Sequence, residues 1–282
     1  MDERVRIRKK MPYIAYPTII LSLFSFSGWL LMFYLYYNFQ LTWYLTLPIS
    51  SLMTYISFTP MHDSVHYSVS KNKLINYIPR LLSSVQFFVS PPSYFRILHL
   101  THHKFTNDPK KDPDYYCSSS FTVCLPFKWL THVLHYFYFF FTHKELYQKY
   151  AHNLIFWIIC VWIPPFYTMT LQEFLILWFI PSQIATVVSV YMFDYTPHKP
   201  HEITIYEDKY GCTNVIDSVF NEKFEFQKLP NESHLLSILT LNQSYHSIHH
   251  LYPYLPFYMY HTVWQENQEK FLDKGVNMVS LV

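Results

Sequence analysis

The sequence predicts an all-α integral membrane protein, with four transmembrane helices in two hairpins and a cytoplasmic helical cap. Two long apolar blocks supply the helices: residues 11–60 contain no charged residue, and residues 151–193 contain only Glu173. All 21 basic residues lie outside these blocks. Histidines gather in four clusters in the polar segments or at the block ends. The chain is expected to form one domain over residues 1–282.

Each apolar block is about twice the ~20 residues that cross a hydrocarbon core, so each predicts a helical hairpin. The first is expected to run over 13–37, turn at 38–40 and return over 41–59. The second is expected over 152–167, with a turn at 168–173 and a return over 174–193. A cleaved signal peptide fits the first block poorly, because the block is too long and lacks a small-residue cleavage site.

The basic residues predict the orientation. Because neither hairpin turn contains Lys or Arg, both termini and the middle segment are expected on the cytoplasmic side, together with all four histidine clusters. The aromatic stretch 121–141 is expected to lie at the interface, since Lys128 and Pro126 interrupt it. Segment 74–95 is interpreted in the same way, segment 198–235 as a polar cap, and the tail from His261 as a short amphipathic helix.

Composition excludes several classes of site. The four cysteines form no CxxC pair, which argues against a zinc ribbon or a disulfide framework. Three glycines are too few for a glycine-rich nucleotide loop, so any electrons are expected from a separate partner. No nucleic-acid partner is expected.

The histidine clusters have the spacing of metal ligands on helices. One is HxxxH and two are HxxHH, and spacings of three and four residues place side chains on one helix face. The fourth, Pro-His-Lys-Pro-His, is looser, and His201 is its weakest member. The ten histidines are His62, His66, His99, His102, His103, His198, His201, His246, His249 and His250.

Ten clustered histidines exceed the four ligands of a structural zinc site, so two metal ions are favoured over one. Neutral imidazole suits Fe, Zn, Cu or Ni. Nearby acids and amides are expected to orient imidazoles by accepting their distal N–H, with Asp63, Asp194 and Asn242 best placed. The turn-rich run from Asp108 to Asp114 is interpreted as a solvated loop, of which at least one carboxylate could hold the second cluster.

These motifs resemble the membrane fatty-acid desaturase/hydroxylase superfamily, and among its members most the bacterial and cyanobacterial type of beta-carotene hydroxylase. The resemblance covers about residues 60–271 and rests on four stretches. They are His62-Asp-x-x-His66, His99-Leu-Thr-His102-His103 with its Asp-Pro-rich continuation, Pro197-His198-Lys-Pro200 and Asn242-Gln-Ser-Tyr-His246-Ser-Ile-His249-His250. One departure is Thr196 before Pro-His198, where ring hydroxylases more often have Leu.

The resemblance implies a di-iron centre that uses O2, and electrons from a ferredoxin or cytochrome-type donor, to oxidise an unactivated C–H bond. Hydroxylation of a carotenoid ring is the first expectation, and desaturation of an acyl lipid by the same site is the alternative. The implied iron ligands are His62, His66, His99, His102, His103, His198, His246, His249 and His250.

Two further interpretations stay open at this point. A histidine-lined metal transporter would place its histidines near the membrane midplane, whereas these lie at or beyond the predicted span ends. The basic residues Arg80, Arg96, Lys104, Lys110 and Lys111 could dock an acidic electron carrier, although cytoplasmic positive charge explains them as well.

Overall fold

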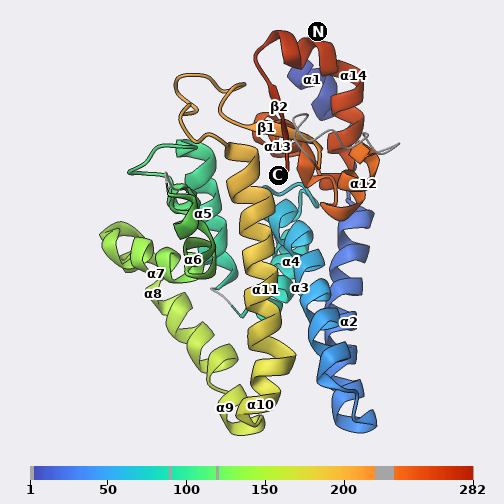
Figure 1. Ribbon diagram of the computed structural model, residues 1–282, viewed down its shortest axis with the longest axis vertical. Coiled ribbons are helices and arrows are strands. Elements are labelled where there is room, and N and C mark those ends of the chain that lie inside the picture. The colour runs from blue at the N-terminus through green and yellow to red at the C-terminus, as the bar shows by residue number, and fades with distance from the viewer. Residues whose placement is uncertain (1–2, 89–90, 119–120, 220–231, 282) are drawn as a thin grey trace.

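The computed structural model describes residues 3–88, 91–118, 121–219 and 232–281. Two long helical hairpins form one end of the molecule and a compact cap forms the other (Figure 1). The two hairpin turns lie together at the end away from the cap, and both chain termini lie on the cap side. This arrangement has the predicted form of two hairpins that cross and return.

The first hairpin consists of α2 (Tyr16–Phe39) and α3 (Trp43–Val65). Gln40 ends α2 in the left-handed conformation, inside the predicted turn. The helices meet through small side chains, since α2 buries Ser22 and Ser25 while α3 buries Ser50 and Thr54. Small residues let two helix backbones approach closely, which is how helices associate where lipid removes the hydrophobic driving force between them.

The second hairpin bends more than the first. Its descending arm is α8 (Lys144–Trp157), the π-turn η3 (Ile158–Trp162) and α9 (Pro165–Thr168). A capping box between Thr170 and Glu173 starts the return arm at the predicted turn. That arm is α10 (Leu171–Phe174), η4 (Leu175–Phe179), α11 (Ile180–Ser189), η5 (Val190–Tyr195) and η6 (Thr196–His198).

The described part of the chain has three helices that are long and apolar enough to cross a membrane: Tyr16–Phe39, Gln148–Thr168 and Leu171–His198. Their large apolar side chains point outward, as Ile20, Phe24 and Phe156 do with more than half of their surface exposed. Apolar residues turned away from the protein interior identify a membrane protein. Helix α3 has the length to cross, but Ser and Thr lower its hydropathy, so the fourth span stays a prediction.

Shorter helices join the hairpins to the cap. Helix α4 (Lys73–Gln86) and α5 (Pro92–Phe105) follow α3, and the 3-10 turn η1 (Pro113–Cys117) follows α5. The aromatic stretch 121–141 is divided into η2 (Thr122–Cys124), α6 (Leu125–Leu130) and α7 (His132–Thr142), with a break at Thr131. Because no continuous helix covers it, this stretch supplies no fifth span.

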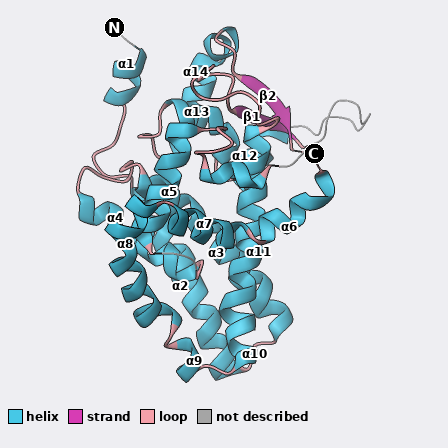
Figure 2. Ribbon diagram, turned by 90° about the vertical axis from the view of Figure 1, so that its left-hand side faces the viewer, coloured by secondary structure: helices cyan, strands magenta, loops and turns pink. Residues whose placement is uncertain are grey.

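The cap gathers sequence-distant elements (Figure 2). It contains α1 (Glu3–Lys9), α12 (Glu232–Leu239), η7 (Gln243–Tyr245), α13 (His246–Leu251), η8 (Phe257–Met259) and α14 (Tyr260–Asp273). Lys10 Nζ contacts Glu266 Oε1 at 2.6 Å, which fastens the N-terminal segment to α14. The tail is helical as predicted, and α14 buries Val263, Trp264 and Phe271 on one face.

The all-α prediction omits a small sheet. Strands β1 (Asn214–Ser218) and β2 (Asn277–Ser280) pair in parallel, with Asn214 opposite Asn277. The two strands are only five and four residues long and lie some sixty residues apart, so their pairing has no local signal in the sequence. The sheet adjoins α13, because Ser247 Oγ donates to the carbonyl oxygen of Thr213. Part of the predicted polar cap, residues 220–231, lies outside the described residues.

Candidate metal centre

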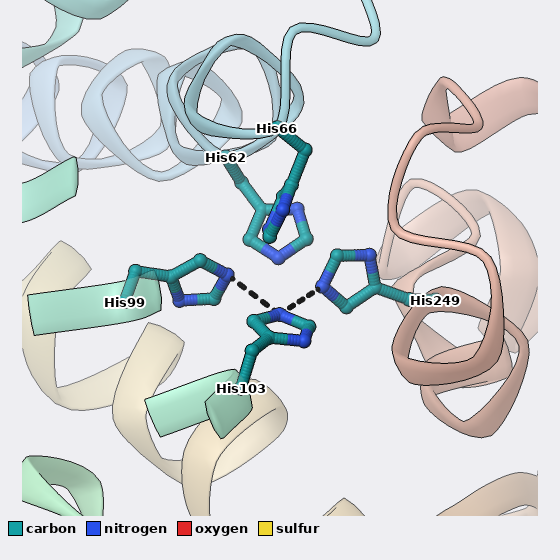
Figure 3. Close-up of side chains that lie close together, drawn as sticks. All are labelled: His62, His66, His99, His103 and His249. Carbon is teal, nitrogen blue, oxygen red and sulfur yellow. Dashed lines mark hydrogen bonds between the residues drawn. The ribbon is translucent and has the colours of Figure 1, made fainter. Parts of the chain in front are cut away.

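Nine of the ten singled-out histidines come together in two adjacent groups. The five-histidine group is His62, His66, His99, His103 and His249, shown in Figure 3. The four-histidine group is His102, His198, His246 and His250. Within each group the ligand atoms lie within 4.8 Å of one another. These are the nine histidines that the family resemblance implied.

Each HxxHH box serves both groups. On α5, His99 and His103 point into the five-histidine group while His102 points into the other. At 100° per residue, His103 lies about 40° around the helix from His99. His102 lies about 60° from His99 in the opposite direction. Helix α13 repeats the division in reverse, with His246 and His250 in one group and His249 in the other.

Two further elements complete the groups. His62 and His66, at the cap end of α3, contribute only to the five-histidine group. His198 contributes to the four-histidine group at the point where η5 and η6 end the second hairpin. The first hairpin and the second hairpin therefore each feed one group, and α5 and α13 connect the two.

The spacing between ring nitrogens fits shared metal ions. His103 Nε2 lies 3.1 Å from His99 Nε2 and 2.8 Å from His249 Nε2. His246 Nε2 lies 3.0 Å from both His198 Nε2 and His250 Nε2. Two nitrogens bound at right angles, each about 2.1 Å from one ion, would be about 3.0 Å apart.

Hydrogen bonding alone explains these contacts less well than a cation does. An imidazole Nε2 carries either one hydrogen or one lone pair, so it cannot donate to one neighbour and accept from another. A shared cation satisfies all the lone pairs together. His66 Nε2 is also buried without a hydrogen-bond partner among the described residues, which suits an atom that binds a cation.

Carboxylates orient one histidine of the four-histidine group. His102 Nδ1 lies 2.9 Å from Asp112 Oδ1 and 3.4 Å from Asp114 Oδ2, while its Nε2 faces His250. Tyr136 donates to Asp114 and holds that carboxylate in turn. Burial alone would lower the pKa of His102, but Asp112 and Asp114 outweigh it and raise the pKa to about 9. The carboxylates therefore favour Nδ1–H and leave Nε2 for the metal side.

Two hydroxyl groups hold other histidines. Tyr260 OH lies 3.0 Å from His249 Nδ1, and Thr106 Oγ1 lies 3.5 Å from His250 Nδ1. The sequence analysis missed both, because neither residue belongs to a histidine cluster and only the folded chain brings them near. The sequence analysis allowed a carboxylate of the Asp108–Asp114 run to hold the second cluster, and Asp112 contacts His102 in this way. The interpretation of this run as a solvated loop is wrong at Asp112 and Asp114, which are buried.

The other residues proposed to orient imidazoles have different contacts. Asp63 accepts from Thr18 Oγ1 at 2.8 Å and from Phe257 N at 3.1 Å, so it fastens α3 to α2 and to the cap. Asp108 accepts from the backbone of its own turn, at Lys110 N and Lys111 N. Neither has a hydrogen bond to an imidazole among the described residues.

Asn242, Asp194 and His201 lie around the groups without joining either of them in the described structure. Asn242 adopts a left-handed conformation, φ 61°, that starts the turn η7 before α13. Asp194 lines a cavity beside the site. The His201 ring lies 5.5 Å from the Tyr195 ring, and burial lowers the pKa of His201 to about 4, which keeps it neutral.

An apolar cavity lies beside the five-histidine group and is separated from it by two of its wall residues. Its walls include Phe58 and Phe95, whose rings stack on His62 and His99 with centroids 5.7 Å apart in both pairs. The volume of the cavity is about 50 Å³. Other wall residues are Met61, Ser84, Phe87, His132, Val133, Tyr136, Thr186, Ser189, Val190 and Asp194.

Comparison with known proteins agrees with this geometry. The family model described as fatty acid desaturase matches residues 39–282, which include every histidine of both groups. A search of curated proteins finds no match to the chain. The family match covers most of the chain, and the nine histidines stand in two metal-sized groups beside an apolar cavity: the chain belongs to the fatty acid desaturase family.

Proposed function

We propose that the two histidine groups hold two iron ions and that the protein oxidises an unactivated C–H bond in a hydrophobic substrate. The observation that carries this proposal is an apolar cavity whose wall residues stack on imidazoles of the five-histidine group. Phe58 and Phe95 line the cavity and also stack on His62 and His99. A hydrocarbon in the cavity would therefore lie beside the five-histidine group, in a space that excludes bulk water.

The donor set suits the proposed cofactor. Nine neutral imidazoles can hold iron, and the bound irons would supply the oxidising power toward a C–H bond when O2 and electrons are provided. Residues of the chain position the histidine ligands and the substrate. Asp112 and Tyr260 fix the rings of His102 and His249, while the aromatic walls of the cavity orient the hydrocarbon.

An acyl chain is the first substrate to test. The family match supports it, and the apolar walls of the cavity suit a hydrocarbon chain. Hydroxylation of a carotenoid ring is the second candidate, favoured by the likeness of the histidine-box sequences to those of carotenoid ring hydroxylases. Both reactions begin by removing hydrogen from carbon, so the histidine groups alone do not distinguish them.

The proposed enzyme requires electrons from outside the site. We propose a ferredoxin or a cytochrome-type protein as the donor, docking on the cap side, and we assign that side to the cytoplasm. The exposed lysines near the site, Lys110 and Lys111, suit an acidic carrier, whereas Arg80 is only 5% exposed and cannot belong to such a docking surface.

Product analysis tests the function. The wild-type protein and His246→Ala are expressed in a host that makes acyl lipids and accumulates beta-carotene, with His152→Ala as a control because His152 is exposed and outside both groups. New unsaturation or hydroxylation in acyl lipids, from wild type and His152→Ala only, is the expected result. Hydroxylated carotene instead would select the ring hydroxylase, and metal movement across the membrane without either product would contradict the enzyme.

A further inference from the structure

Helix α4 has its polar and apolar faces reversed relative to a helix of a soluble protein. Leu74, Tyr77 and Ile78 point outward and are 65%, 40% and 46% exposed. The inward face carries polar residues instead, including Arg80, which is 5% exposed. An apolar outer face suits contact with lipid at the membrane boundary. The polar inner face is therefore directed at something inside the protein.

Arg80 has no counter-ion in the described structure. Its Nε and Nη1 atoms are buried without a hydrogen-bond partner among the described residues, and the Nε of Arg96 on α5 is in the same condition. No ion pair between described residues includes either arginine. Each guanidinium instead lies over an aromatic ring, Arg80 at 5.7 Å from the centre of Tyr77 and Arg96 at 4.7 Å from that of Tyr67.

The two arginines also act on each other. Burial, and then the positive charge of Arg96, lower the pKa of Arg80 to about 10, so the guanidinium still carries its charge at neutral pH. Two cations held close together, one of them buried, are unfavourable unless an anion accompanies them. The tyrosine rings offset only part of this cost.

We propose that Arg80 and Arg96 form a binding site for the anionic headgroup of a lipid, a carboxylate or a phosphate. Guanidinium groups present paired N–H donors whose geometry matches the oxygens of both groups. The anion would supply acceptors for the unpaired nitrogens and the negative charge that the arginine pair lacks. Arg96 is only partly buried, so a headgroup can reach the arginine pair from its side.

The position of the arginines links the headgroup site to the cavity. Ser84, one helical turn after Arg80 on the same face of α4, lines the cavity, and so does Phe95, the neighbour of Arg96. A headgroup at the arginines would therefore lie about one helical turn from the cavity, into which its acyl chain would extend. This assignment of the ligand as substrate rests on the proposed oxidation of a lipid, whereas anion binding itself does not.

Binding measurements on the full-length protein in neutral-lipid nanodiscs test the proposal without catalysis. The probes are a fluorescent C18 fatty acid, its methyl ester, phosphatidic acid, diacylglycerol and inorganic phosphate alone. Wild type is compared with Arg80→Met and Arg96→Met. Lys73→Met is the matched control, because Lys73 is an exposed cation on the same helix.

We expect wild type and Lys73→Met to bind at least one of the two anionic lipids about tenfold or more tightly than its neutral counterpart. Each arginine variant should lose this preference. A preference for the fatty acid identifies a carboxylate headgroup, and one for phosphatidic acid a phosphate headgroup. The proposal is overturned if wild type binds neutral and anionic lipids equally, if both arginine variants keep the preference, or if inorganic phosphate alone displaces the lipid and binds as tightly.

Thermal melting separates this role from a structural one. In neutral-lipid nanodiscs without anionic lipid, Arg80→Met should melt at or above the melting temperature of wild type, because it removes an uncompensated buried charge. Anionic lipid should then raise the melting temperature of wild type only. A lower melting temperature for Arg80→Met without lipid, together with equal stabilisation of both proteins by lipid, would assign Arg80 to folding. If the wild-type protein binds anionic lipid but oxidises none, the proposed function is contradicted and the headgroup site is not.

Discussion

The two histidine groups differ less in their own ligands than in what surrounds them. In the four-histidine group, His102 is held by two buried carboxylates, Asp112 and Asp114. In the five-histidine group, the outer contact is a neutral hydroxyl, Tyr260 OH on His249, and the charge nearest to His66 outside the histidines is the cation of Arg96. Among the described residues, a carboxylate contacts an imidazole in the four-histidine group only, because Asp63, beside His62 in the chain, accepts from Thr18 and Phe257 instead.

This difference means that the two metal positions are inequivalent. Carboxylates behind an imidazole raise its basicity and strengthen its hold on a cation, whereas a nearby cation weakens it. The five-histidine group offers one more ligand but adjoins the apolar cavity through His62 and His99. We therefore expect the four-histidine group to hold an ion more firmly than the five-histidine group.

The largest expected effect comes from removing a ligand. His250→Ala leaves three histidines in its group, whereas His103→Ala leaves four in the other. We expect His250→Ala to retain about one iron per chain and to lose activity, since three imidazoles leave a site open. His103→Ala should retain more iron than His250→Ala. Metal analysis of the purified proteins measures both, with His152→Ala as the control that keeps two ions. Two ions in His250→Ala would contradict the grouping.

A smaller effect on metal binding is expected from removing Asp112 or Tyr260, which contact the Nδ1 atoms of His102 and His249. Once the affinity is corrected for protonation of His102, Asp112→Asn should weaken first-row metal binding to the four-histidine group about 10- to 100-fold, because it removes the charge that supports His102. Tyr260→Phe removes only a neutral hydrogen bond, worth about 1 kcal/mol, so less than tenfold is expected in the five-histidine group. Titration with Co²⁺, followed by absorbance, separates the two positions. Asp108→Asn is the control, and equal losses in Asp112→Asn and Tyr260→Phe would contradict the asymmetry.

The last expected effect is a difference between the two groups in how metal affinity depends on pH. The pKa of His102 is raised to about 9, so in the metal-free protein both ring nitrogens of His102 carry a proton at pH 7. A metal ion must displace the proton on Nε2. Burial lowers the pKa of His99, His103 and His249 well below the usual range, so these rings are neutral at pH 7. Affinity of the four-histidine group should therefore rise up to about tenfold per pH unit below pH 9.

Calorimetry in two buffers of different ionisation enthalpy measures this proton. We expect about one proton released per ion bound to the four-histidine group at pH 7 and none from the other group. Asp112→Asn should reduce the release, because the pKa of His102 falls when Asp112 is lost, although Asp114 remains. Equal release from both groups would remove the electrostatic distinction between them.

Much of this architecture was predictable because its signals are local. Long runs without charge predict helices that cross a membrane, and three of them have the required length and hydropathy. The turns at Gln40 and Thr170 fall where the apolar blocks are interrupted. Spacing of three and four residues predicts histidines on a common helix face, and the nine implied by the family resemblance are the nine that come together.

The chain by itself determined which histidines could meet, but only the tertiary structure decided how they divide. A 60° turn around α5 sends His102 to a different group from His99, and that choice depends on where α3, α13 and His198 lie. The pairing of β1 with β2, the contact of Tyr260 with His249 and the burial of Arg80 likewise join residues from separate elements. Local sequence carries periodicity and charge, whereas these contacts depend on long-range packing that no short stretch encodes.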